Sequence, residues 1–436
     1  MRRLAWLFVL VLAAGACTEQ ATSPGVCPNF CPGGSIQVRD TIFTTIIGRD
    51  SAFRGYVQGY QASAMAAADL PAVQSRPFFV LRSTFTRVAP KAGDTVTVPI
   101  AVDSSRLRVA IVRRAKQATN LQLKLYRLPL TADSTSSFAL LDPFFNGPVV
   151  DSVNVSALLA GPAIGDTATL RIWGDTIRTD SAGHVLQIQR GDSALLVYFT
   201  MDTLEAPFSV PDSGRLAFGV RVAADSFASL SLGANESVNN GPLMRWFYHY
   251  TIPDTVSATP DSVAHRDQAI VPGFDSFVFD PPNPPLDSNL VVGGVPAARS
   301  LLRVAMPAFL RDSFDVVRAT MILVPVAAFP GAPNDSLTIL ARPVLTDLGA
   351  KSPLNATNLV NGQAVVHPGS TDTVRIELTD LVRSWALDTT LATAVFLGQS
   401  PEAASWTEIR FYSSRASALR PALQVTYVKR FPFGAP

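Results

Sequence analysis

Cysteine is almost missing from this chain of 436 residues. The only three, Cys17, Cys27 and Cys31, fall within the first 31 positions, and none follows. Cys27 and Cys31 have three residues between them, whereas a redox pair has two, and no second pair completes a four-ligand zinc site. The body of the protein is therefore expected to be stable through burial alone, without thiol chemistry.

Histidine and glutamate are also scarce, with four and six residues. The histidines, His184, His249, His265 and His367, are never within four positions of one another. No H-E-x-x-H or G-x-S-x-G motif occurs, and nothing singles out the two placed carboxylates that a glycosidase needs. We therefore expect no enzymatic activity. A hydrolase with a Ser-His-Asp triad, which only geometry reveals, stays open as an alternative.

Charge is low as well: charged residues make up 16% of the chain, and the net charge is +2. The one basic cluster, Arg113-Arg114 with Lys116, is short, so the sequence predicts no nucleic-acid partner. Proline and glycine are plentiful instead, at 33 and 27 residues. This composition is typical of a strand-rich chain with many turns, and the length favours two domains.

The first 17 residues have the pattern of an export signal. Arg2 and Arg3 precede an apolar run over 4–14, which is too short to span a bilayer and has the length of a signal-peptide core. Small residues and then Cys17 follow, an order that resembles the lipobox of bacterial lipoproteins. The resemblance implies lipid attachment at Cys17 and anchoring outside the cytoplasmic membrane. An ordinary secretory signal with a chance cysteine is the alternative.

Residues 17–35 are polar, small and rich in proline and glycine, so they are predicted to form a flexible tether. Because an exported chain meets an oxidising compartment, we expect a disulfide between Cys27 and Cys31, with free thiols as the alternative. Thr18 after the cysteine, in place of Asp, favours the outer membrane or cell surface over the inner membrane.

Alternation of apolar and polar residues dominates the rest of the chain and predicts strands with one buried face. It occurs at 153–155, 337–339, 374–378 and 409–411. Asp-Ser or Asp-Thr pairs precede many of these runs, and such side chains favour turns. We assign the pairs to turns and not to calcium ligation, because the acids are scattered singly and no EF-hand spacing is present.

The chain also repeats internally. NGPLMRWFYHYTI (240–252) aligns with LRPALQVTYVKRF (419–431) at a shift of 179. SRLRVAIV (105–112) aligns with SLLRVAMP (300–307) at a shift of 195. The difference between the shifts predicts extra strands in the first copy.

These extra strands are expected within 160–215. Each copy has the length of a β-sandwich that closes on its own sheets, and the polar stretch 253–268 is expected to separate them. The predicted fold is all-β, with two tandem jelly-roll-like β-sandwich domains. The predicted segments are 1–16 (lipoprotein signal peptide), 17–35 (flexible tether), 36–255 (first domain, with the insertion) and 256–436 (second domain).

Five stretches of the second copy follow one another in a recognisable order and spacing over about 270–430. They are DSNLVVGG (287–294), ARSLLRVAMPAFL (298–310), VVRATMILVPV (316–326), DTVRIELTDLVRSWA (372–386) and RFYSSRASALRPALQVTY (410–427). On these stretches the second copy resembles the DNRLRE domain of bacterial and archaeal secreted and cell-wall proteins. The usual LLRFDL of that family is LLRVAM here, and the first copy matches only through the internal repeat. The resemblance implies a jelly-roll-like sandwich similar to carbohydrate-binding modules, and it carries over no catalytic residues.

Aromatic side chains are the candidates for a ligand surface. We assign the alternating aromatics of 246–250 to the core. Trp385 follows Leu381 by four residues, so in a short helix both would face the sheet, and we assign Trp385 to the core as well. Trp173 and Trp406 stand next to turn residues, so we expect them to be exposed and name them as candidate ligand contacts.

The sequence therefore predicts a lipid-anchored extracytoplasmic protein with a non-enzymatic structural or adhesive role at the cell surface. No cofactor and no metal site are predicted. The expected partners are the membrane, through the lipid anchor, and a polysaccharide or surface protein. The alternative function is a pair of carbohydrate-binding modules that recognise a cell-wall or environmental polysaccharide.

Overall fold

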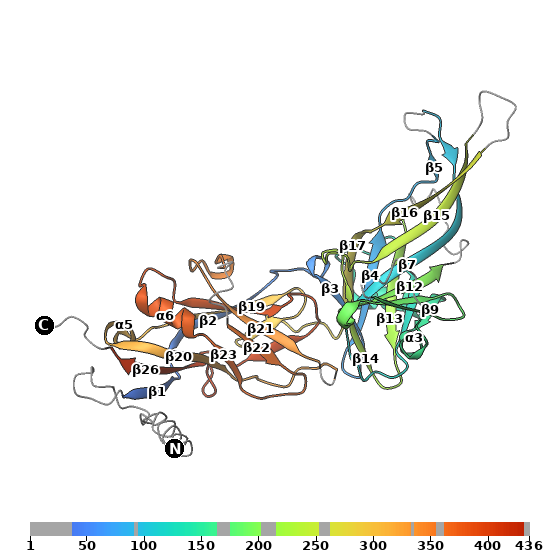
Figure 1. Ribbon diagram of the computed structural model, residues 1–436. Helices are drawn as coiled ribbons and strands as arrows, with labels where there is room; N and C mark the ends of the chain where they lie inside the picture. The colour runs from blue at the N-terminus through green and yellow to red at the C-terminus, as the bar shows by residue number, and fades with distance from the viewer. Residues whose placement is uncertain are drawn as a thin grey trace, which may run out of the picture.

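The chain forms two all-β bodies joined end to end (Figure 1). The structure, a computed structural model, describes residues 37–90, 95–163, 175–201, 215–252, 262–332, 335–354 and 362–430. The strand pairs of these residues are antiparallel, and the sheets are large and curled. The predicted all-β sandwich fold is confirmed.

Domain 1, on the right in Figure 1, consists of one continuous curled sheet of 13 strands and a separate two-stranded sheet, β5-β6. A row β9-β8-β13-β4-β3-β14 is joined through β7 to a row β16-β15-β7-β12, and β17 lies on the free edge of β4. Its strands are β3 (Ala64–Asp69), β4 (Gln74–Leu81), β5 (Arg87–Val88), β6 (Val98–Pro99), β7 (Ala101–Arg114), β8 (Gln122–Arg127), β9 (Val149–Asn154), β10 (Thr176–Thr179), β11 (Val185–Ile188), β12 (Leu195–Met201), β13 (Ala217–Ala223), β14 (Ala228–Gly233), β15 (Leu243–Ile252), β16 (Ser262–Ile270) and β17 (Pro272–Asp280). Its short helices are η1 (Gly59–Gln61), α2 (Phe138–Leu141), η2 (Asp142–Asn146), α3 (Val155–Ala160) and η3 (Arg190–Asp192).

Domain 2 has the same two rows as separate sheets, β22-β21-β24-β19-β18-β25 and β1-β26-β20-β23, with β2 on the free edge of β19. Its strands are β1 (Val38–Phe43), β2 (Ile47–Arg54), β18 (Leu290–Gly293), β19 (Ala298–Val304), β20 (Phe314–Leu323), β21 (Leu337–Pro343), β22 (Gly362–Val366), β23 (Val374–Glu377), β24 (Ala394–Ser400), β25 (Glu408–Phe411) and β26 (Ala422–Lys429). Its helices are α5 (Ala308–Asp312), η5 (Gly349–Lys351) and α6 (Thr379–Leu387).

The two domains have the same strand order, so the internal repeat is real. Of the two sequence alignments, the one at a shift of 179 is correct and the one at a shift of 195 is wrong. β15 matches β26, as the alignment of 240–252 with 419–431 requires, and the same shift of 179 brings β14 onto β25. By contrast, β7, which contains 105–112, matches β20, and β4 matches β19, which contains most of 300–307. β7 and β19 are both apolar strands with similar sequences, and only their neighbours in the sheet show that they are not equivalent. The extra strands expected within 160–215 include β10 and β11, which extend the sheet beyond β12.

Each copy of the repeat gives its first two strands to the other domain. The domain boundaries therefore differ from those expected at 36–255 and 256–436. β1 and β2 precede domain 1 in the chain but pair with β26 and β19 of domain 2. β16 and β17 pair with β15 and β4 of domain 1. The division is therefore 59–280 for domain 1, and 37–58 with 281–430 for domain 2. β16 is an edge strand and is largely exposed on both faces. It therefore has little alternation of apolar residues, and for that reason the sequence pattern of 253–268 is typical of a linker.

The cores follow the predicted alternation. Trp246, Tyr248 and Tyr250 are at most 6% exposed, as assigned. In domain 2, α6 covers its sheet with Leu381, Val382 and Trp385, and Trp385 is 1% exposed. The aromatic stripe is thus core and offers no stacking surface.

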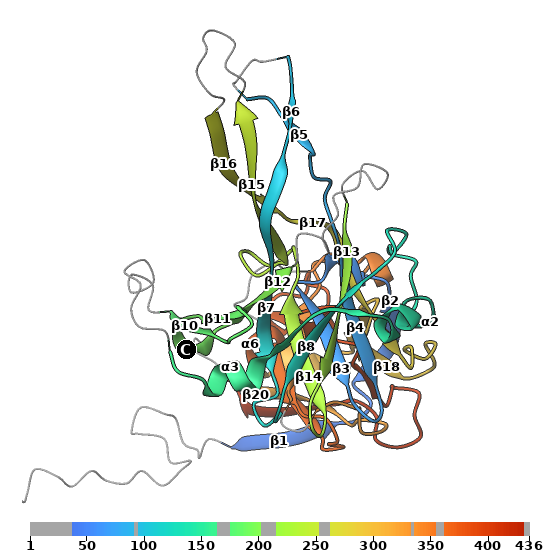
Figure 2. The ribbon, with the colours of Figure 1, turned by 90° about the vertical axis from the view of Figure 1, so that its right-hand side faces the viewer.

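An arm projects from the body of domain 1 (Figure 2). It consists of β5, β6, the first half of β7, and the paired β15 and β16. The chain enters domain 2 at the end distant from domain 1, through β1, while the arm lies beyond domain 1 (Figure 1).

Candidate functional site

The two chain crossings between the domains form a polar seam, which we define as segments 55–58 and 281–289 with their contacts. The second crossing begins with PPNPP, and four of its first five residues are prolines. Proline has no backbone N–H and cannot pair as a regular strand. The carbonyl groups of this segment must therefore find donors elsewhere.

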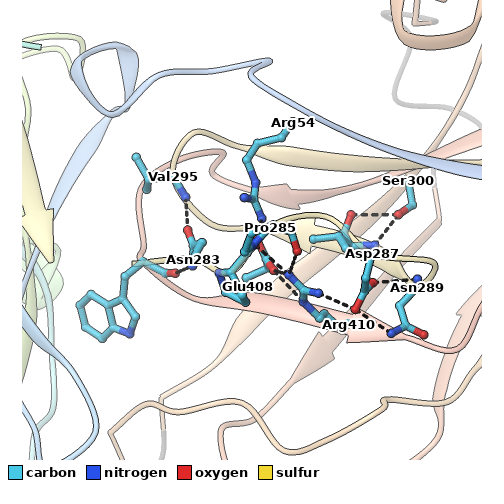
Figure 3. Close-up of polar contacts among 12 residues, drawn as sticks. Arg54, Asn283, Pro285, Asp287, Asn289, Val295, Ser300, Glu408 and Arg410 are labelled. Atoms are coloured by element: carbon cyan, nitrogen blue, oxygen red, sulfur yellow. Dashed lines mark hydrogen bonds and ion pairs between the residues drawn. The ribbon is translucent and has the colours of Figure 1, made fainter. Parts of the chain in front are cut away.

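Two arginines supply those donors (Figure 3). Arg54, at the end of β2, donates to the carbonyl of Pro284 at 3.0 Å. Arg410 of β25 donates to the carbonyls of Pro284 and Pro285 at 2.9 and 2.8 Å. An exchanged strand and a resident strand thus hold the same crossing.

Asn283 fixes the middle of the crossing through both ends of its amide (Figure 3). Its Nδ2 donates to the carbonyl of Trp406 at 2.9 Å, and its Oδ1 accepts from the backbone N–H of Val295 at 2.8 Å. The segment is therefore tied to two loops of domain 2.

Glu408 balances the arginine charges. Its side chain is 4% exposed and forms ion pairs with Arg54 and with Arg410, the latter at 2.8 Å. Arg410 also contacts Asp287 at 2.7 Å. Partial burial alone raises the pKa of Asp287, but hydrogen bonds from Asn289 and the Arg410 charge outweigh it and lower the pKa. Two cations and two anions thus offset one another, as partly buried charges require.

The first crossing is held by backbone and aromatic contacts. The N–H of Gly55 donates to the carbonyl of Ala297 at 3.0 Å, and the N–H of Ala297 donates to the carbonyl of Val57 at 2.8 Å. Arg299 lies over the ring of Tyr56, with its Cζ 4.3 Å from the ring centroid, and makes two 2.7 Å hydrogen bonds with Glu402. Cation–π and bidentate contacts of this kind are among the stronger polar interactions.

A cleft of about 460 Å³ opens beside the seam. Its lining includes Arg54, Tyr60, Asp133 and Asp280, together with serine hydroxyls at 134, 136 and 137. Tyr60 is 38% exposed, and its ring lies 5.9 Å from that of Phe274. An aromatic face next to hydroxyl and carboxylate groups has the chemistry to hold a polar ring such as a sugar.

Of the predicted site residues, Cys17, Cys27, Cys31 and Trp173 lie outside the described residues. The exposure expected of Trp406 is wrong, because it is 4% exposed and belongs to an apolar cluster that includes residues of domain 1. The turns beside Trp406 suggested solvent, but the neighbouring domain covers it. Trp406 is therefore part of the seam and is not available as a stacking surface.

Sequence reasoning missed Arg54, Glu408 and Arg410. Two signals could have indicated them. The PPNPP run between expected strands requires outside donors for its carbonyls. In β25 the alternation of Ile409 and Phe411 places Glu408 and Arg410 together on the other face.

Comparison with known proteins gives no relative: no family model, no curated protein and no solved structure matches the chain. In the part of the chain that the structure describes, no helix is both long and apolar enough to cross a membrane.

Proposed function

We propose that this protein is anchored by lipid at Cys17 outside the cytoplasmic membrane and has a non-enzymatic structural or adhesive role at the cell surface. In this proposal domain 2 stands near the membrane, and domain 1 with its arm is held away from it. The partners are the membrane and a surface protein or polysaccharide. The resemblance of the second copy to DNRLRE domains of cell-wall proteins supports the same assignment.

The strand exchange is the observation that carries the proposal. β1 begins at Val38, directly after the predicted tether, and pairs with β26 over six aligned residues. Domains joined by one linker are expected to move relative to each other. Here β2 leads from domain 2 into domain 1, and the chain returns through the PPNPP segment that Arg54 and Arg410 hold. A force applied between the tether and domain 1 would therefore pass through two chain crossings and not one, which suits a structural or adhesive protein.

The anchor is tested by Cys17→Ser in the full-length chain. We expect the variant to leave the membrane fraction and appear in the soluble extracytoplasmic fraction. Cys27→Ser is the matched control and should stay in the membrane fraction. Continued membrane retention of the Cys17→Ser variant would overturn the anchor.

Carbohydrate binding at the cleft is the second candidate, favoured by the exposed ring of Tyr60 among hydroxyl and carboxylate groups. A glycan array probed with the full-length chain tests it. Binding should be lost in Tyr60→Ala and kept in Phe247→Ala, an aromatic of similar exposure on the arm. Absence of binding to any polysaccharide would remove this candidate and leave the anchor untouched.

A further inference from the structure

Three side chains with metal-binding atoms meet on the arm, outside the seam. They are Asp103 of β7, His249 of β15 and His265 of β16. These strands are neighbours, with β15 between the other two (Figure 2). His249 lies directly opposite His265 in the ladder, so the two imidazoles share one face of the sheet.

A β-bulge brings the carboxylate to the same face. Phe247 pairs with Ser104 and Tyr248 pairs with Val102, so Asp103 is the extra residue. Asp103 and Ser104 are both exposed although they are consecutive, whereas Ser105 is buried. In a regular strand one of the two would point inward. Bulges commonly re-aim a side chain in this way near functional sites.

The ligand atoms are already close together. Asp103 Oδ1 lies 2.5 Å from His249 Nδ1, and Asp103 Oδ2 lies 3.4 Å from His265 Nδ1. One nitrogen or oxygen from each of the three residues lies within 4.8 Å of the others. A tetrahedral site with metal–ligand bonds of about 2.0–2.1 Å needs separations of about 3.3 Å, so small rotations admit an ion.

We propose that Asp103, His249 and His265 form a binding site for a divalent transition-metal cation of the zinc class. Two imidazole nitrogens and one carboxylate suit Zn²⁺, whereas Ca²⁺ and Mg²⁺ take oxygen ligands. The His265 side chain is 72% exposed, and those of His249 and Asp103 are 37% and 36% exposed. The site therefore faces solvent, and its fourth position is open to water.

Three arginines lie near the site. Arg245 of β15 shares the face of His249, and its guanidinium pairs with Asp267 of β16 at 3.3 Å. Arg106 of β7 is exposed opposite Arg245, and Arg266 donates to the carbonyl of His265 at 3.0 Å. A bound ion would link three strands of the arm at a point where β16, among the residues that the structure describes, pairs with β15 alone.

The site is tested by equilibrium dialysis of the full-length chain, purified in detergent without a histidine tag, against Zn²⁺. Wild type should bind one more zinc ion than His265→Ala, and Asp103→Asn should bind at least tenfold more weakly. His367→Ala is the matched control and should retain the wild-type stoichiometry. Cobalt substitution should give the visible absorption of a tetrahedral site in wild type and in the control variant only.

His265 is well exposed, so His265→Ala is expected to keep its fold, which circular dichroism in the presence of chelator checks. Equal zinc stoichiometry and equal affinity in wild type, His265→Ala and Asp103→Asn would overturn the proposal. In that case the three residues form only an ion pair. The three cysteines are the same in every variant, so zinc bound to thiols cancels in the comparison.

Discussion

Val38 lies directly opposite Val428, so the first and last strands of the described chain are neighbours in one sheet. All of domain 1 lies between them in sequence. β16 and β17, the first strands of the second copy, pair with β15 and β4 of domain 1 before the chain returns to domain 2. Neither half of the chain, divided at a midpoint linker, contains a complete domain.

Residues 59–280 should therefore fold alone, whereas residues 36–255 should not. The second fragment lacks β17, which covers the edge of β4 and contributes the buried Phe277 and Val278. We expect a cooperative urea transition, followed by circular dichroism, for 59–280 only. A transition of equal sharpness and midpoint in 36–255 would contradict the exchange.

Domain 2 gives the complementary prediction. Residues 281–430 alone leave the edges of β19 and β26 unpaired, and unpaired edges favour aggregation. A peptide of residues 37–58 should bind this fragment and raise its unfolding temperature. The peptide 262–280, which carries the corresponding strands of domain 1, is the control. Equal stabilisation by both peptides would show that the pairing is not specific.

Glu408→Gln should destabilise domain 2 by about 3–5 kcal/mol, because it removes the anion that pairs with Arg54 and leaves the two arginines with Asp287 alone to offset their charges. Glu408 faces two arginines whose side chains are only 20% and 19% exposed. Asp315→Asn is the matched control, since its ion pair with Arg430 is exposed and should contribute about 0–1 kcal/mol. Urea unfolding of both variants measures the difference. A similar small effect in the two variants would show that the seam charges are well solvated.

Local patterns in the sequence were sufficient for the fold class and for much of the core. Alternation placed Trp246 inside domain 1, and the four-residue spacing from Leu381 placed Trp385 against its sheet. These features depend on the residue and its near neighbours in the chain, so periodicity reveals them.

The strand exchange and the sites depend on partners that are distant in sequence, and periodicity carries no such information. Arg54 and Glu408 have no local signal for their ion pair, and Trp406 is covered by a domain whose position the sequence does not give. His249 and His265 are an intermediate case. If β15 and β16 are recognised as a hairpin, their pairing places the two histidines opposite each other. Because β16 is exposed, its sequence predicts a linker and not a strand.

His184 should make domain 1 less stable as pH rises above about 6.5. Burial alone lowers the pKa of His184, but its hydrogen bonds to Asp180 and Asp151, at 2.7 and 2.9 Å, outweigh it and raise the pKa above 6.5. The stabilisation is therefore complete below about pH 6.5 and is lost as pH rises through the pKa of the folded state.

His184→Gln should cost about 1–3 kcal/mol at pH 6 and less at higher pH. Urea midpoints measured from pH 5.5 to 9 test this, with the exposed His367→Gln as the control. A His184→Gln variant that keeps the wild-type pH profile would show that the pKa of His184 does not change on folding.

Asp275 should give domain 1 a second pH dependence, in a more acidic window. Its carboxyl is 2% exposed on the exchanged strand β17. Burial raises its pKa to about 7, although the N–H of Asn235 donates to Oδ2 at 2.7 Å and lowers it somewhat. The folded state thus keeps a proton that the unfolded chain releases near pH 4. The stability contribution is complete below about pH 4 and is lost as pH rises through about 7.

Each pKa unit corresponds to about 1.4 kcal/mol, so wild type should lose stability over this window at up to that amount per pH unit. Asp275→Asn keeps an oxygen that can accept from Asn235 but cannot ionise. We expect this variant to match wild type near pH 4 and to exceed it in free energy of unfolding at pH 8. Urea unfolding of residues 59–280 between pH 4 and 8 measures how the free energy of unfolding changes with pH in wild type and in Asp275→Asn. An unchanged slope between pH 4 and 7 in Asp275→Asn would show that another group releases the proton.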